Sequence, residues 1–183
     1  MSLRYGLLGL LCYQDMTGYD LNKTFESSLQ FMWNVKSSQI YRELSKMEDE
    51  KLVTSRIEAQ EKKFDRKVYS ITSLGKETFQ EWVKKFPQNL IAPIRDEFIV
   101  RIFFGEAVGY DNLIFEIQRF KRQQEEALDV LSIVEGSATE AARDGGLETS
   151  LFYWMLTISR ARKAIVAEIE WSEETIELIK NKR

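Results

Sequence analysis

Polar and cationic side chains gather on one face of a predicted helix in the N-terminal half of this 183-residue chain. Over residues 37–47, Ile40, Leu44 and Met47 recur at the helical spacing of a buried stripe, which turns the remaining positions outward. Serine and glutamine can hydrogen-bond to base edges, arginine can hold guanine or phosphate, and a tyrosine hydroxyl can donate to phosphate. The helix is therefore a candidate for reading double-stranded DNA. Its candidate contacts are Ser37, Ser38, Gln39, Tyr41, Arg42 and Lys46.

A second group of cations follows within twenty residues, and it comprises Lys62, Lys63, Arg66 and Lys67. The flanking segments VTSRIEAQ and RKVYSIT have the β-branched, alternating pattern of a two-stranded hairpin, which places the group at and beside its turn. A lone cluster of this kind is usually solvated surface charge. Directly after a helix of the type described above, it favours contact with a run of phosphates or with the minor groove.

These side chains need a scaffold, and the hydrophobic pattern predicts three helices and a hairpin ahead of a fourth helix. The first helix covers about residues 3–14, and the second begins near Thr17 as its N-cap. The third begins at Ser37 or Ser38, each a good N-cap, and Thr72 caps the fourth. Three helices followed by a two-stranded hairpin is the order of a winged helix-turn-helix, whose later helix enters the major groove by its N-terminal end.

Two prolines, Pro87 and Pro93, mark the best internal boundary, because proline ends or precedes helices. We therefore expect two domains, residues 1–86 and 87–183. The first contains 14 Lys and Arg against 12 Asp and Glu, and the second contains 12 against 17. Although the whole chain has a net charge of −3, any contact with a polyanion is expected in the N-terminal domain.

The C-terminal half contains only helical patterns, so the expected fold class is mainly α. A short helix covers about residues 94–105, and a longer helix after Gly109 carries apolar residues at alternating spacings of four and three, a heptad seam. The sequence around Gly136 and Gly145-Gly146 predicts a break. The last helix then keeps the same seam from about residue 147 to residue 180, over roughly 50 Å.

The last helix carries more apolar surface than one partner helix covers, which favours a second copy of the chain as its partner. The alternative is an antiparallel hairpin within a monomer. The residues expected at a dimer contact are Leu151, Met155, Ile158, Ile165 and Ile169.

Aromatic residues on the last helix are expected to form a cluster of Phe152, Tyr153, Trp154 and Trp171. Packing in the core or in a dimer is one explanation. An effector pocket is the other, because aromatic walls suit planar organic ligands. Trp33, just before the third helix, fits either role, so the candidate ligand-binding residues are Trp33, Phe152 and Trp154.

The composition excludes several kinds of active site. The chain has no histidine, which removes histidine-based catalysis and histidine-ligated zinc. Its one cysteine, Cys12, is expected in the core rather than as an exposed redox sensor. With no glycine-rich phosphate motif and no carboxylate or lysine site that we can place, we expect neither an enzyme nor a bound metal or cofactor. No run of about 18 apolar residues occurs, so we expect no transmembrane helix and a cytoplasmic protein.

In combination, four segments resemble the PadR family of bacterial transcriptional regulators over about residues 3–86. They are LLGLL, TGYDLNKTF, the segment SSQIYRELSKMEDEKLV after Trp33, and KVYSITSLGKETFQEW. The C-terminal half resembles, by pattern and length, the helical dimerisation domain of the longer PadR subgroup, the virulence-activator-like C-terminal domain. Two departures stand out, since Lys51 replaces the family's usual glycine after the helix and the turn EKKFD lacks the usual glycine and proline.

The resemblance implies a homodimeric regulator, usually a repressor, which a small molecule releases from DNA in some members. It places the recognition helix on residues 37–47 and the basic wing on residues 62–67. We accordingly expect each recognition helix of a dimer to enter a major groove of a roughly palindromic operator. The alternative is a protein-interaction adaptor that uses the winged helix as a docking surface, which the net acidic charge makes reasonable.

Overall fold

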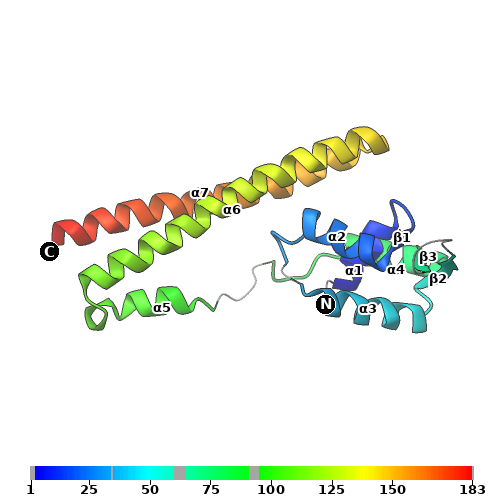
Figure 1. The fold of residues 1–183 in the computed structure, drawn as a ribbon, viewed down its shortest axis with the longest axis horizontal. Helices are drawn as coiled ribbons and strands as arrows, with labels where there is room; N and C mark the ends of the chain where they lie inside the picture. Colours follow the sequence, from blue (N-terminus) through cyan, green and yellow to red (C-terminus); the bar gives the residue numbers. More distant parts are fainter. Residues whose placement is uncertain (1–2, 34, 60–64, 91–94, 183) are drawn as a thin grey trace. The chain divides into compact units, whose positions relative to one another are not determined.

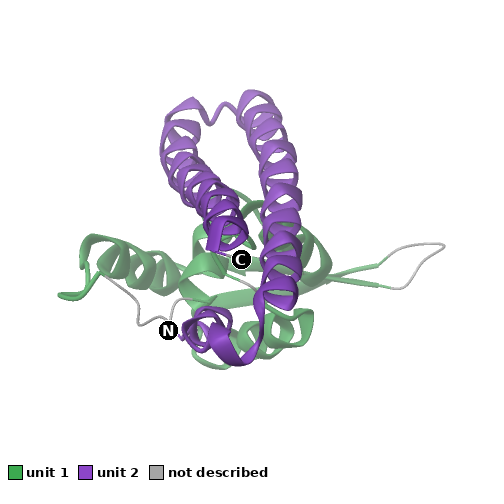
Figure 2. Cartoon of the chain, turned by 90° about the vertical axis from the view of Figure 1, so that its left-hand side faces the viewer, with its two compact units in different colours: residues 1–91 green, residues 92–183 purple. Residues whose placement is uncertain are grey.

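The computed structural model describes residues 3–33, 35–59, 65–90 and 95–182. The chain divides into two compact units, Met1–Ile91 and Ala92–Arg183, which are described separately (Figure 2). The division falls between residues 91 and 92, whereas the prolines place the predicted boundary between residues 86 and 87.

In its described residues, unit 1 contains three helices, a small sheet and a fourth helix, in the predicted order for a winged helix-turn-helix (Figure 1). Its helices are α1 (Leu3–Leu11), α2 (Gly18–Ser28), α3 (Ser37–Asp49) and α4 (Ser73–Lys84). Its strands are β1 (Met16–Thr17), β2 (Val53–Glu58) and β3 (Arg66–Ile71).

The sheet has three antiparallel strands in the order β1-β3-β2, so the prediction of a two-stranded hairpin was incomplete. The hairpin of β2 and β3 pairs Val53 with Ile71 and Glu58 with Arg66. The additional strand pairs Met16 with Tyr69. Two residues are too few for an alternating pattern, which is why the sequence did not reveal β1.

The core of unit 1 lies between α1, α2 and α3, and α3 contributes one stripe of apolar residues to it. Ile40, Leu44 and Met47 of α3 are fully buried, as predicted, and pack with the leucines of α1 and with Leu21 and Phe25 of α2. Burying each such side chain contributes about 1.5–3 kcal/mol relative to exposure. The opposite face of α3 is consequently free to carry polar residues.

The placement of Cys12 in the core was wrong. Helix α1 ends at Leu11, three residues earlier than predicted, and Cys12 lies in the exposed turn that follows. The partial burial of the thiol raises its pKa, which disfavours the reactive thiolate.

The helix N-caps fit the prediction at two of three positions. The Oγ1 atoms of Thr17 and Thr72 accept hydrogen bonds from the N–H groups of Asp20 and Gly75, each at 3.0 Å. At α3 the predicted serine cap was wrong. Lys36 is the N-cap, and its N–H donates to Oε1 of Gln39 at 2.9 Å, so that Ser37 becomes the first helical residue.

Helix α3 ends in a Schellman turn in which a lysine takes the left-handed conformation. The N–H groups of Leu52 and Lys51 donate to the carbonyls of Met47 and Glu48. Lys51 has a φ of 60°, a value that favours glycine. The absence of the family's glycine has therefore not altered the helix end, and the chain bears the strain instead.

Unit 2 is entirely helical in its described part (Figure 1). It contains α5 (Glu97–Phe103), a short 3-10 helix η1 (Gly105–Ala107), α6 (Tyr110–Gly145) and α7 (Glu148–Lys182). The long helices α6 and α7 pack along each other as an antiparallel hairpin (Figure 2). Gly146 closes α6 with a φ of 63°, whereas the predicted break at Gly136 was wrong, since packing against α7 outweighs the roughly 1 kcal/mol cost of one helical glycine.

The heptad seam of α7 is used within the chain. Ile158 and Ile176 of α7 and Ile117 and Leu131 of α6 are buried in the hairpin. The seam positions predicted to contact a second copy are at least half-covered within one chain; they are Leu151, Met155, Ile158, Ile165 and Ile169. The covering helix is α6, so the chain forms the antiparallel hairpin that was the alternative.

The predicted aromatic cluster on α7 was wrong in its inclusion of Trp171. The ring of Trp171 contacts those of Phe98 on α5 and Phe120 on α6, at 6.4 and 6.1 Å between centroids. Phe152 instead contacts its neighbour Tyr153. Nineteen helical residues between positions 152 and 171 correspond to roughly 28 Å, so one helix cannot bring the two groups together.

Candidate nucleic-acid interface

The N-terminal end of α3 is exposed and electropositive. Lys36, Ser37, Ser38 and Gln39 are all exposed, and the first turn contains no acidic residue. The unpaired N–H groups and the dipole of a helix give this end a partial positive charge. Gln39 also caps the helix through its side-chain oxygen, which leaves its amide NH₂ to donate to a partner.

Most of the acidic residues of α3 are paired with the scaffold. The carboxylate of Glu43 accepts a hydrogen bond from Arg4, and the carboxylate of Glu48 accepts one from Lys67 and another from Ser55. Glu50, at the C-cap, is paired with Arg4 as well. Asp49, in the last turn, is exposed on the same face as Arg42 and Lys46. Among the described residues, the outward face therefore carries two cations and one unpaired acid near its C-terminal end.

Arg42 and Lys46 supply those cations. Both are exposed, and neither forms an ion pair with any residue that the structure describes. They lie four residues apart on one face of α3, next to the exposed ring of Tyr41. Their position leaves the two charged groups available to an external anion.

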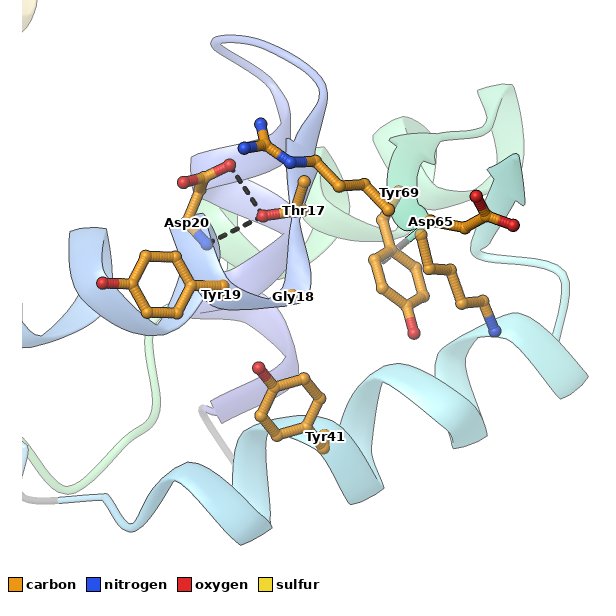
Figure 3. A pocket seen from close by; sticks show the side chains of 9 residues that line it. Thr17, Gly18, Tyr19, Asp20, Tyr41, Asp65 and Tyr69 are labelled. Atoms are coloured by element: carbon orange, nitrogen blue, oxygen red, sulfur yellow. Dashed lines mark hydrogen bonds between the residues drawn. The ribbon is translucent and has the colours of Figure 1, made fainter. Parts of the chain in front are cut away.

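Tyr41 is seated against the N-terminus of α2. A Cβ atom added to Gly18 would lie 2.6 Å from Cε1 of Tyr41, so only glycine allows this ring position (Figure 3). Gly18 therefore makes room at the start of α2 for a ring from α3.

A hollow of about 570 Å³ lies between the start of α2, the middle of α3 and the start of β3 (Figure 3). Its lining combines hydroxyls, cations and two acids and comprises Thr17, Gly18, Tyr19, Asp20, Tyr41, Asp65, Arg66, Lys67 and Tyr69. Sequence reasoning missed Tyr19 and Tyr69. Tyr19 directly follows Gly18, which faces α3 in the structure. The sequence does not show which element lies against Gly18, so it gave no means of finding Tyr19.

Of the two predicted wing cations that the structure describes, one is paired within the protein. Lys62 and Lys63 lie outside the described residues. Arg66 is exposed beside the hollow, whereas Nζ of Lys67 lies 2.7 Å from Oε2 of Glu48 and 5.1 Å from the ring centroid of Tyr69. The hydrogen bond to Lys67 lowers the pKa of Glu48, and the same bond raises the pKa of Lys67.

The three candidate ligand-binding residues belong to different units. Trp33 is exposed in unit 1, while Phe152 and Trp154 lie on α7 in unit 2. Their positions therefore do not define a common pocket within either unit.

Membrane-spanning helices and metal-binding groups are both absent from the described residues. In the part of the chain that the structure describes, no helix is both long and apolar enough to cross a membrane. The described cysteine and acidic residues also form no group of three or more that could hold a metal ion.

Comparison with known proteins agrees with this arrangement. Residues 7–81 match the transcriptional regulator PadR-like family, and residues 94–180 match the family described as virulence activator alpha C-term. The negative transcriptional regulator PadR of Bacillus subtilis is 29% identical over 182 residues, which cover 97% of each chain.

Solved structures cover both units of the chain. Bacillus subtilis PadR in complex with operator DNA matches with a TM-score of 0.82 and 26% identity, over 98% of each chain. The same regulator in complex with p-coumaric acid matches with a TM-score of 0.76 and 26% identity, over 98% of this chain and 99% of the other. The Vibrio cholerae virulence activator AphA matches with a TM-score of 0.74 and 26% identity over the whole of both chains. The chain belongs to the PadR-like family of transcriptional regulators.

Proposed function

We propose that this protein is a homodimeric, sequence-specific DNA-binding repressor in which α3 enters the major groove by its N-terminal end. The exposed start of α3 carries this proposal, because it presents hydroxyl, amide and cationic groups without a first-turn carboxylate. Ser37, Ser38 and Gln39 are the proposed base-reading residues. Tyr41, Arg42 and Lys46 are proposed to hold phosphate or guanine, with Arg66 and the wing lysines on the adjacent backbone.

Two comparisons support repression through DNA. The Bacillus subtilis relative that covers 97% of the chain is named a negative transcriptional regulator, and its structure was solved with operator DNA. A repressor must reach chromosomal DNA, so we place the protein in the cytoplasm. Regulators need no catalytic centre, and we assign none here.

A second copy of the chain is the proposed partner of unit 2. The hairpin seam covers one face each of α6 and α7, yet Val130 and Ile133 on α6 and Phe152 and Leu156 on α7 remain exposed away from it. Apolar residues repeated along one helix face are typical of an interaction surface. A symmetric dimer would bury them and would present two copies of α3 to a palindromic operator.

A small planar aromatic molecule is the proposed effector. The Bacillus subtilis regulator was crystallised with p-coumaric acid, and this chain carries exposed or half-exposed aromatic residues at Trp33, Phe152 and Trp154. We propose that such a ligand shifts the dimer between two states that differ in the spacing of the recognition helices.

DNA binding is tested by passing the protein over immobilised generic DNA at increasing salt, followed by selection of duplexes from a randomised pool. A DNA-binding regulator is retained at low salt, is released as salt rises and enriches one sequence class. No salt-dependent retention would contradict the proposal and favour the protein-interaction adaptor.

A further inference from the structure

Arg4 on α1 binds two glutamates of α3, Glu43 in the middle of the helix and Glu50 at its C-cap, and we call this contact the clamp. Nε of Arg4 lies 2.9 Å from Oε1 of Glu43, while Nη1 and Nη2 of Arg4 lie 2.6 and 2.9 Å from the two carboxylate oxygens of Glu50. Two parallel N–H bonds to one carboxylate form a fork that fixes direction as well as distance. The side chains of Arg4 and Glu43 are 26% and 18% exposed, so this pair is largely removed from water.

Both ends of the fork oppose the dipole of their own helix. Arg4 is a cation in the first turn of α1, where the dipole favours anions, and Glu50 is an anion at the C-cap of α3, where it favours cations. Neither residue is therefore placed for the stability of its own helix. Their placement is explained by the contact that they make with each other across the two helices.

The clamp sets which face of α3 points outward. Glu43 and Glu50 are seven residues apart, two turns along one face, and a single guanidinium holds both. Arg42 lies roughly 100° around the helix from Glu43 and shares its face with Lys46. Holding the two acids against α1 fixes both the rotation and the axial position of the side chains proposed to meet DNA.

We infer that Arg4 is a positioning residue for sequence readout: through Glu43 and Glu50 it holds α3 in the register that aligns its polar N-terminal end with base edges. The inference rests on the proposed DNA-binding function. The apolar stripe of α3 attaches the helix to the core of unit 1. Aliphatic contacts are not directional, so they tolerate small rotations of the helix about its axis. Base-edge hydrogen bonds require alignment to within about 0.5 Å and 10–20°.

The test compares the full-length wild-type protein with Arg4→Lys on two duplexes. One is the duplex enriched by the wild-type protein from a randomised pool, and the other has the same bases in shuffled order. Lysine keeps the charge but cannot form the fork. Affinity for the selected duplex is expected to fall about tenfold, while affinity for the shuffled duplex and the slope of log K against log salt stay unchanged.

Two further variants separate positioning from general stability. Glu50→Gln should reproduce the loss on the selected duplex, and Arg4→Lys should add little to it, because both changes break the same fork. Arg101→Lys in α5 alters an exposed Arg–Glu pair of the other unit and should leave both affinities unchanged. All affinities are measured at a temperature where thermal unfolding shows every variant folded.

Each remaining outcome overturns the inference in a distinct way. Equal losses of affinity on both duplexes would make Arg4 a direct phosphate contact. A lower melting temperature with an unchanged affinity ratio would make the clamp purely structural. If the wild-type protein enriches no duplex, the proposed function fails, and the role of Arg4 fails with it.

Discussion

On α3, the surroundings of each charged residue follow from the face on which it lies. Acids on the scaffold side pair with Arg4 and Lys67, whereas Arg42 and Lys46 on the outer side form no ion pair with a described acid. Pairing these carboxylates with Arg4 and Lys67 offsets their negative charge, which would otherwise repel a nearby phosphate backbone. The cations on the outer face should therefore contribute more to DNA binding than their number suggests.

Arg42→Ala and Tyr41→Phe are expected to weaken binding to the selected duplex by about 1–3 kcal/mol each. For Arg42→Ala the salt slope should also fall by about 0.9, since one phosphate-directed charge is lost. Fluorescence anisotropy at several salt concentrations measures both quantities. Lys163→Ala, at an exposed position of α7, is the matched control. Unchanged affinity in both variants would contradict the assignment of this face.

Replacement of Lys51 by glycine is expected to stabilise unit 1 by about 1 kcal/mol. The left-handed φ of 60° costs a side chain roughly that amount, and glycine adopts it freely. Chemical denaturation measures the change, with Lys51→Ala as the control that keeps a Cβ atom and its strain. Equal stability of the glycine and alanine variants would show that the backbone here is unstrained.

At the level of the elements, the junction between α3, the wing and α4 depends on Thr72 and two carbonyl groups. The N–H of Thr72 donates to the oxygen of Leu52 at 3.1 Å, and its hydroxyl lies 2.8 and 3.0 Å from the carbonyl oxygens of Lys51 and Leu52. Thr72 in turn caps α4 by accepting from the N–H of Gly75. The spacing of threonine and glycine in SITSLGKETF is thereby explained: threonine ties the helix to the sheet, and glycine leaves room for the carbonyl.

Gly75→Ala is expected to destabilise the protein by about 1–3 kcal/mol, because its Cβ atom would lie 2.1 Å from the Leu52 oxygen. This loss outweighs the roughly 1 kcal/mol that alanine contributes to a helix. Gly136→Ala in α6 is the matched control, since no atom lies within 4 Å of its added Cβ and it should stabilise the hairpin. Urea unfolding that finds the two variants equally stable would contradict the role given to Gly75.

Periodicity and capping chemistry are local, and the predictions that rest on them agree best with the structure. The buried stripe of α3 and the threonine caps of α2 and α4 were readable because each involves residues within two turns. The hydrogen bond from Lys67 to Glu48 could not be predicted from the sequence, because Glu48 lies 19 positions away on a different element. The same limit hid Gly18, whose neighbour is a ring on another helix.

For the whole molecule, the heptad seam shows that a pattern can identify a helix face without identifying its partner. Spacings of four and three identify a helix face that must be covered, but they do not specify whether the covering helix belongs to the same chain. Gly146 reverses the chain and lets α6 cover α7. We therefore expect a dimer to use the exposed apolar residues away from the seam as well.

Ile133→Glu is the sharpest test of that conclusion. The side chain is 69% exposed, so a glutamate there should leave the hairpin folded while placing a charge in the proposed dimer contact. Light scattering after size-exclusion chromatography should give twice 21.5 kDa for the wild-type protein and a lower mass for the variant. Affinity for a palindromic duplex should fall at least tenfold, because one subunit holds only one half-site. Ser159→Glu, at an exposed polar position of α7, controls for added charge. A variant that stays dimeric and binds as tightly as the wild-type protein would exclude the face of α6 that carries Ile133 from the dimer interface.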